Sequence, residues 1–186
     1  MSEVSSSSQR TADALRAHGH EILSFLRGVL RDDATADDAF QLFAERLFRT
    51  MDSFAGDCSL RTWLYLLARH AVRDVQRSTA PRGRRVSLTD ADVYSLVLEQ
   101  LRTATPSLLG TPRRDAIARL RDELPEADRL LLVLRVDRGL PWLELARIFA
   151  DEDGADLRRE SARLRKRFQS VKERLRAMAK ARALLD

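Results

Sequence analysis

The side chains that can do chemistry are few in this sequence, and their spacing matches no catalytic motif. Cys58 is the single cysteine, so an internal disulfide is excluded. His18, His20 and His70 share no metal-ligand spacing with it. The sequence also contains no glycine-rich phosphate loop and no nucleophile elbow. We therefore expect a non-enzymatic protein with no cofactor and no metal site.

Charge is unevenly distributed along the chain, and two segments carry opposite signs. Between Arg31 and Asp57 there are three basic and seven acidic residues, a local charge of minus four. Between Arg158 and Arg182 there are eleven basic and two acidic residues, a local charge of plus nine. The second segment indicates a partner rich in phosphate.

In the acidic segment, Asp38, Gln41 and Glu45 follow one another at steps of three and four residues. This spacing places them on one face of a helix, opposite its apolar stripe. Two interpretations stay open. The strip is either a solvated face beside a helix cap formed by Thr35, or a docking surface for a basic partner.

Arginines and aromatic residues alternate in the next predicted helix, and they lie on or beside one outer edge of it. The group consists of Arg61, Trp63, Tyr65, Arg69, Arg73 and Arg77. Aromatic faces stack unpaired bases and arginines hold the neighbouring backbone, so the pattern suits single-stranded nucleic acid. Alternatively, Trp63 belongs to the core, because it also falls on the apolar stripe.

The last predicted helix is basic on its exposed side, where Arg163, Arg165, Lys166 and Arg167 surround an apolar anchor. With the preceding helix it has the pattern of a helix-turn-helix, whose second helix enters the major groove. A basic amphipathic helix also suits an anionic membrane surface or a calmodulin-like partner.

The composition predicts an all-α fold, because glycine and proline are scarce and helix-forming residues dominate. Apolar residues recur at helical spacing in seven stretches. We expect helices over 13–31, 36–51 with Thr35 as N-cap, 60–78 with Ser59 as N-cap, 113–124, 126–137, 141–149 and 161–184. Pro125 separates the fourth from the fifth, Gly139 ends the fifth, and Pro141 lies in the first turn of the sixth.

Proline and glycine punctuate residues 79–112, which we interpret as a flexible linker with one optional helix at Asp92–Arg102. The expected layout is a disordered tail over 1–11, a first helical domain over 12–78, the linker, and a second helical domain over 113–186. No apolar run reaches the roughly 18 residues of a membrane span, and no secretory signal is visible. We expect a cytoplasmic protein without membrane insertion.

Two parts of the sequence resemble a known family. The runs TADDAFQLFAERLF at 35–48 and SFAGDCSLRTWLYLLAR at 53–69 resemble region two of the RNA polymerase sigma factors. The run LPEADRLLLVLRVDRGLPWLELA at 124–146 is similar to the start of sigma region four. Two such regions joined by a short linker are the layout of the extracytoplasmic-function (ECF) group.

This resemblance implies core RNA polymerase and promoter DNA as partners, with a role for each group of residues. Asp38, Gln41 and Glu45 would contact the clamp helices of the largest polymerase subunit. The residues implied for the minus-ten element are Gly56, Asp57, Cys58, Ser59, Arg61, Trp63, Tyr65, Arg69, His70 and Arg73. The residues implied for the minus-thirty-five element are Arg163, Arg165, Lys166, Arg167, Lys172 and Arg174. A dedicated anti-sigma factor is implied as well.

Two departures from the family pattern bear on these roles. His70 stands where the family commonly has asparagine, which alters the hydrogen-bonding geometry, and Ala150–Glu160 is longer and more acidic than the usual turn before the recognition helix. Two alternatives to a sigma factor follow. One is a helix-turn-helix regulator that needs no polymerase, and the other is an interaction module whose region four no longer reads DNA.

Overall fold

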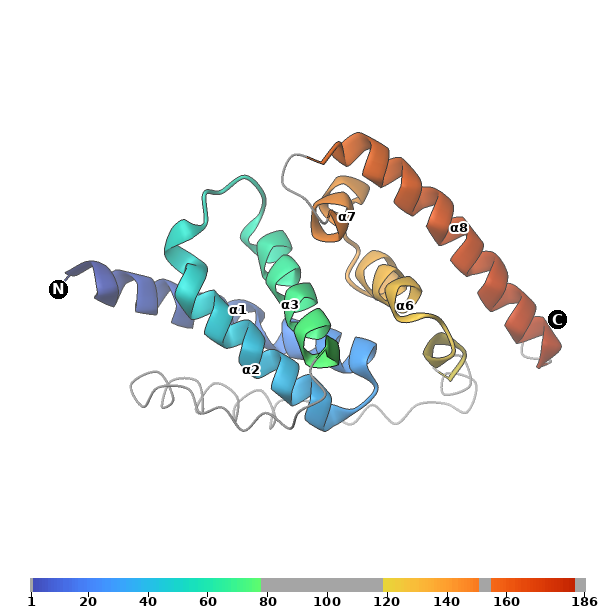
Figure 1. Ribbon diagram of the computed structural model, residues 1–186, viewed down its shortest axis with the longest axis horizontal. Helices are drawn as coiled ribbons and strands as arrows, with labels where there is room; N and C mark the ends of the chain where they lie inside the picture. Colours follow the sequence, from blue (N-terminus) through green and yellow to red (C-terminus); the bar gives the residue numbers. More distant parts are fainter. Residues whose placement is uncertain (1, 78–118, 151–154, 183–186) are drawn as a thin grey trace. The chain divides into compact units, whose positions relative to one another are not determined.

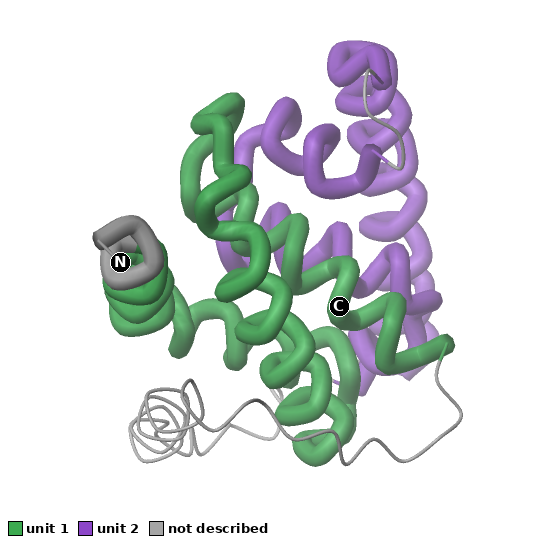
Figure 2. Tube along the Cα trace, turned by 60° about the vertical axis from the view of Figure 1, so that its left-hand side comes forward, with its two compact units in different colours: residues 1–106 green, residues 107–186 purple. Residues whose placement is uncertain are grey.

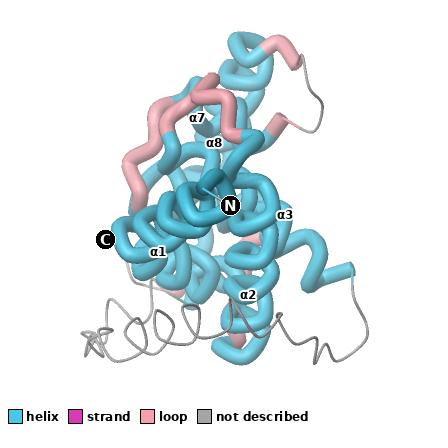
Figure 3. Tube along the Cα trace, turned by 90° about the vertical axis from the view of Figure 1, so that its left-hand side faces the viewer, coloured by secondary structure: helices cyan, strands magenta, loops and turns pink. Residues whose placement is uncertain are grey.

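The computed structural model describes residues 2–77, 119–150 and 155–182. The chain divides into two compact units, residues 1–106 and residues 107–186 (Figure 2). Within the described ranges all regular structure is helical and no strand occurs (Figure 3), which confirms the predicted all-α fold. The predicted linker and its optional helix at Asp92–Arg102 lie outside the described residues.

The first unit is built from α1 (Ser2–Leu30), α2 (Asp33–Thr50), the 3₁₀ turn η1 (Met51–Ser53) and α3 (Leu60–Arg77). The three long helices pack side by side (Figure 1) because each contributes an apolar stripe to one core. Aromatic rings fill its centre: Phe25, Phe40, Phe43 and Tyr65 are each at most 1% exposed. This core holds the outer faces of α2 and α3 at fixed positions.

The disordered tail predicted for residues 1–11 is wrong for the part that the structure describes, because α1 already begins at Ser2. Thr11, Ala12 and Leu15 are buried and anchor the early turns of the helix. Extending an existing helix adds one hydrogen bond per residue and needs no new nucleus, so the serine-rich start continues it despite modest propensity. At its other end α1 stops at Leu30, because Arg31 adopts a positive φ of 63°.

The N-caps agree with the sequence at α3 and differ at α2. Ser59 Oγ accepts a hydrogen bond from the Thr62 amide at 3.1 Å, as predicted. At α2 the cap is Asp32, whose carboxylate accepts the Thr35 amide at 2.7 Å and the Thr35 hydroxyl. These bonds hold the pKa of Asp32 below its ordinary value of 3.8. The prediction of Thr35 as N-cap is therefore wrong, and Thr35 instead completes the cap as the third helical residue.

The described part of the second unit contains a helical turn at 119–122, α6 (Glu126–Leu132), the π-helical turn η2 (Val133–Asp137), α7 (Trp142–Phe149) and α8 (Leu157–Ala181). As predicted, Pro125 separates the first two helical segments, and Gly139, at φ 67°, follows the end of η2. Pro141 is the N-cap residue of α7 and not part of its first turn.

The final helix begins earlier than predicted. We expected it to start near Ser161, whereas α8 starts at Leu157. Asp156 is the N-cap, and its side chain accepts the amides of Arg158 and Arg159. Asp156 lies within residues 150–160, which the sequence suggested to be a long acidic turn. Because α8 starts at Leu157, the last four residues of that stretch belong to the helix. In α8, Leu164 and Val171 are buried and hold the helix against the rest of the unit.

Among the helices that the structure describes, none is long and apolar enough to cross a lipid bilayer.

Candidate nucleic-acid interface

The acidic strip lies on the face of α2 that points away from the core. Asp38 is exposed, and Gln41 and Glu45 are half-buried, while Ala39 and Phe43 on the opposite face are inside. Within the described residues, neither Asp38 nor Glu45 has a hydrogen-bond or ion-pair partner for its side chain. Both side chains are thus available to an external cation.

The loop between η1 and α3 exposes most of its residues. Gly56 adopts a φ of 79°, and the space where a β-carbon would stand is open. Asp57 is exposed, and Cys58 is half-buried. The Ser59 hydroxyl lies 2.8 Å from the hydroxyl of the buried Thr62, so the end of the loop is tied to the first turn of α3. The loop is therefore accessible and is anchored at its C-terminal end.

The aromatic side chains of α3 differ in their surroundings. Trp63 is half-buried and stacks on Phe54, with ring centroids 4.8 Å apart and 30° between the planes. Tyr65 is 0% exposed, and its ring meets Phe25 edge-on in the core. The expectation that Tyr65 faces a nucleic acid strand is therefore wrong for this structure, whereas Trp63 keeps part of its surface accessible.

The basic side chains of α3 also differ in their exposure. Arg69 is only 5% exposed and thus lies inside the unit, contrary to the outer-edge position expected from the sequence. Arg73 and His70 are half-buried. Burial lowers the pKa of His70 below its ordinary value of 6.5, and the positive charges of Arg46, Arg69 and Arg73 lower it further, although Asp74 opposes them. His70 is consequently neutral at physiological pH.

Arg46 is a basic residue near His70 that the sequence did not single out. Its Nη2 lies 2.6 Å from an Asp74 carboxylate oxygen, which joins α2 to α3 across part-buried surface. Its Nη1 is buried and has no hydrogen-bond partner in the described structure. A cationic group thus lies beside the imidazole of His70 from the neighbouring helix.

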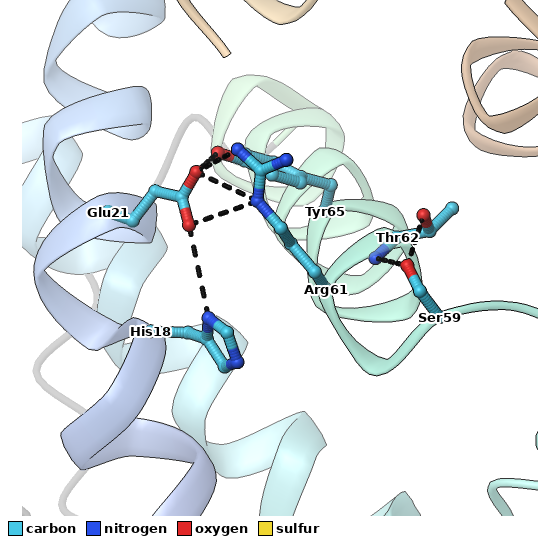
Figure 4. A network of polar contacts seen from close by, with 6 residues as sticks. All are labelled: His18, Glu21, Ser59, Arg61, Thr62 and Tyr65. Carbon is cyan, nitrogen blue, oxygen red and sulfur yellow. Dashed lines mark hydrogen bonds and ion pairs between the residues drawn. The ribbon is translucent and has the colours of Figure 1, made fainter. Parts of the chain in front are cut away.

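A second missed residue, Glu21 of α1, organises the start of α3 (Figure 4). Both Glu21 carboxylate oxygens accept hydrogen bonds from Arg61 Nε, at 3.0 and 3.2 Å, and Arg61 Nη2 donates to one of them. The Tyr65 hydroxyl donates to the same carboxylate at 2.7 Å. Only its place next to the apolar Ile22 on the inner side of α1 hinted that Glu21 has an internal role.

Most of the basic residues singled out on α8 already have partners or neighbours within the unit. Arg163 pairs with Glu160, one helical turn away. Arg167 Nε lies 2.6 Å from an Asp128 carboxylate oxygen, and Arg174 lies 3.5 Å from the other oxygen of Asp128. Asp128, which the sequence did not reveal, is therefore the residue that orients this side of α8.

The remaining basic residues of α8 lie over aromatic rings or are exposed. The Arg165 guanidinium stands 5.8 Å from the ring centroid of Trp142, and Lys172 Nζ stands 5.4 Å from that of Phe168. Lys166 is exposed, and no ion pair engages its ammonium group within the described residues. Arg163, Arg165 and Lys166 together form the accessible basic face near the start of α8.

Comparison with known proteins shows which family the first unit is similar to. Residues 14–82 match the family Sigma-70 region 2. The chain is 27% identical to the ECF RNA polymerase sigma-E factor of Escherichia coli K12 over 136 residues, which is 69% of each chain. It is 30% identical to the ECF RNA polymerase sigma-E factor of Salmonella typhimurium LT2 over 110 residues, 55% of this chain and 56% of that protein.

Proposed function

Because this chain belongs to the ECF group of RNA polymerase sigma factors, we propose that it binds core RNA polymerase and directs it to promoters, where it stabilises the opened DNA. Its role is to bind and position macromolecules, since sigma factors are not a family of catalytic enzymes. The observation that carries the proposal is the match of residues 14–82 to region two, together with the accessible acidic strip on α2.

Polymerase docking would use Asp38, Gln41 and Glu45. Asp38 and Glu45 are the carboxylates of α2 that face outward without a side-chain partner in the described residues. Charges that are not neutralised internally steer a basic partner and contribute to the rate and specificity of its binding. The amide of Gln41, one turn from each carboxylate, would add a hydrogen bond.

The minus-ten element would be held as a single strand by the loop from Gly56 to Ser59 and by the first part of α3. The loop is exposed, and Trp63 beside it offers part of an aromatic face. Unstacking a base costs a few kcal/mol, which stacking and backbone contacts offset. Arg73 and His70, which are half-buried farther along α3, would meet the following nucleotides.

The minus-thirty-five element would be bound as duplex by the second unit. An exposed basic face at the start of a helix fits the major groove, and Arg163, Arg165 and Lys166 provide such a face on α8. Lys172 and Arg174 would contact phosphates. The anti-sigma factor implied by the family remains a prediction.

The test is a pull-down of purified core RNA polymerase by the wild-type chain and by the variant Asp38→Arg with Glu45→Arg, at moderate salt. We expect the wild type to retain polymerase and the variant to lose it, because reversing both charges opposes a basic partner. The matched control is Asp13→Arg with Asp52→Arg, the same charge change at exposed positions of the same unit, which should still bind.

Failure of the wild type to bind polymerase would overturn the proposal. If the wild type then bound duplex DNA tightly without polymerase, the chain would instead act as an ordinary helix-turn-helix regulator. Equal loss of binding in the acidic-strip variant and its control would remove the docking role of the strip.

A further inference from the structure

Three side chains converge on Glu21 at the contact between α1 and the start of α3. In addition to Arg61 and Tyr65, His18 lies nearby, with its Nδ1 3.9 Å from a Glu21 oxygen (Figure 4). The side chains of Glu21 and Arg61 are 26% and 36% exposed, so water screens the pair only in part. The hydrogen bond with Glu21 also raises the pKa of Arg61, so the guanidinium stays charged.

The carboxylate holds two points of α3 on the same helical face, because Arg61 and Tyr65 are four residues apart. The second of these points, Tyr65, is held rigidly because its ring is buried against Phe25. The Arg61 guanidinium lies 5.6 Å from the centroid of the Tyr65 ring. A hydrogen-bonded network of this kind allows the first turn of α3 little freedom to rotate or slide relative to α1.

The first turn of α3 directly follows the loop from Gly56 to Ser59, which is proposed to bind the minus-ten element. Ser59, the last residue of the loop, is bonded through its hydroxyl oxygen to both the backbone amide and the hydroxyl of Thr62. Trp63 follows directly and stacks on Phe54 at the other end of the loop. The loop therefore joins α3 at Leu60, directly before Arg61, the first of the two residues that Glu21 fixes. Both ends of the loop contact this first turn, through Ser59 and through Phe54.

We propose that Glu21 is a positioning residue for promoter opening: by holding Arg61 and Tyr65 it presets the loop from Gly56 to Ser59, together with Trp63, in the geometry that captures unpaired bases. The inference rests on the proposed function. It gives Arg61 a different role from the one expected from the sequence, because Arg61 acts on the loop through Glu21 and does not contact DNA.

The experiment follows open-complex formation by holoenzymes made from core polymerase and each full-length variant. The probe is a promoter duplex selected from a random library by the wild-type holoenzyme, and permanganate reactivity of unpaired thymines reports opening. Initial DNA binding and the rate of opening are measured separately, as are the affinity for core polymerase and the thermal unfolding of each variant. The variants are Glu21→Gln, Arg61→Glu and the exchange Glu21→Arg with Arg61→Glu.

We expect Glu21→Gln to slow opening about tenfold, the effect of losing a charge-assisted hydrogen-bond network, while the affinity for core polymerase and for closed promoter DNA stays unchanged. The exchange variant restores an ion pair of opposite orientation and should recover opening to within about threefold of wild type. Arg27→Gln is the control. It removes a comparable part-buried ion pair between α1 and α2, in which Arg27 Nη2 lies 3.7 Å from Asp37 Oδ1, and it should leave the opening rate unchanged.

Three results would overturn the inference. Glu21→Gln could open DNA as fast as wild type, polymerase affinity could fall by the same factor as opening, or the exchange variant could regain thermal stability without regaining opening. The last result would mean that Arg61 contacts DNA directly. A wild-type holoenzyme that opens no promoter would instead refute the proposed function itself, before any variant is compared.

Discussion

Residues of the same type have different roles in this protein, and their surroundings decide which. Arg61 and Arg167 resemble surface cations in the sequence, yet each is bonded to a carboxylate about forty positions away along the chain. Lys166, next to Arg167, is exposed. Removing one partner of a part-buried pair leaves the other charge uncompensated, whereas removing an exposed lysine changes mainly what the surface can bind.

This difference predicts opposite outcomes for two neighbouring substitutions. Arg167→Ala should lower the free energy of unfolding by about 1 kcal/mol, because Asp128 loses its closest cation. Lys166→Ala should leave it within about 0.5 kcal/mol of wild type. Urea unfolding followed by the fluorescence of Trp142, in a Trp63→Phe background so that only the second unit reports, checks both. Equal losses in the two variants would contradict the assigned roles.

His70 predicts a dependence of stability on pH. Its pKa is lowered on folding from the ordinary 6.5, so the unfolded chain binds the proton more readily. Protonation of His70 in the unfolded chain therefore lowers the free energy of unfolding. This loss is absent above about pH 6.5, grows as the pH falls through that value, and is complete below the pKa of His70 in the folded protein. Urea unfolding at about pH 7.5 and about pH 5.5 should show a smaller loss on acidification for His70→Asn than for wild type. An identical loss would refute this origin of the acid sensitivity.

At the scale of the elements, helix ends determine where functional side chains stand. Asp32, Ser59 and Asp156 each accept backbone amides at the start of a helix, and these three caps set the first residues of α2, α3 and α8. Between η2 and α7 the chain instead turns at Gly139, where a positive φ reverses its direction before Pro141.

Gly139 offers a direct test of this turn. Nothing lies within 4 Å of the position a β-carbon would take, so Gly139→Ala adds no clash and only the strain of its φ of 67°. We expect the free energy of unfolding to fall by about 1–2 kcal/mol in the alanine variant and by less in Gly139→Asn, because asparagine tolerates this conformation. Chemical denaturation of the full chain measures both. An alanine variant as stable as wild type would show that the turn relaxes without cost.

At the scale of the whole molecule, the two most strongly charged regions lie in different units. The acidic strip belongs to the unit that matches sigma region two, whereas the densest basic segment lies in α8 of the other unit. An acidic strip on one unit and a basic helix in the other would allow a basic protein surface and a phosphate backbone to be bound by different parts of one chain. DNA binding should accordingly depend on ionic strength through the cations of α8.

A measurement of promoter affinity against salt concentration tests this separation. Each phosphate contact adds a slope of about −0.9 to the plot of log affinity against log salt. Lys172→Ala in the holoenzyme should reduce the magnitude of the slope by about that amount, because Lys172 is one of the proposed phosphate contacts, whereas Arg119→Ala, which removes an exposed charge outside α8, should leave it unchanged. An unaltered slope for Lys172→Ala would exclude this lysine from the interface.

The sequence predicted the elements well because the signals for them are local. Apolar spacing identified the stripes of α1, α2, α3 and α8, and Pro125, Ser59 and Gly139 marked three of the boundaries correctly. The boundaries it missed were decided by competition among nearby groups. At α2, Asp32 takes the cap that Thr35 also suits, and at α1 burial of Thr11 extends the helix toward Ser2.

By itself, the sequence determined the all-α fold and the resemblance to the sigma factors, because helical periodicity and short motifs are carried by residues close together in the chain. Only the tertiary structure decided which charged side chains are available to partners. Glu21 bonds Arg61, and Asp128 bonds Arg167, across separations of 40 and 39 residues. Tyr65 is buried, with its ring packed edge-on against Phe25. Such pairings depend on how helices pack, and helical spacing specifies a face of one helix without specifying what lies against it.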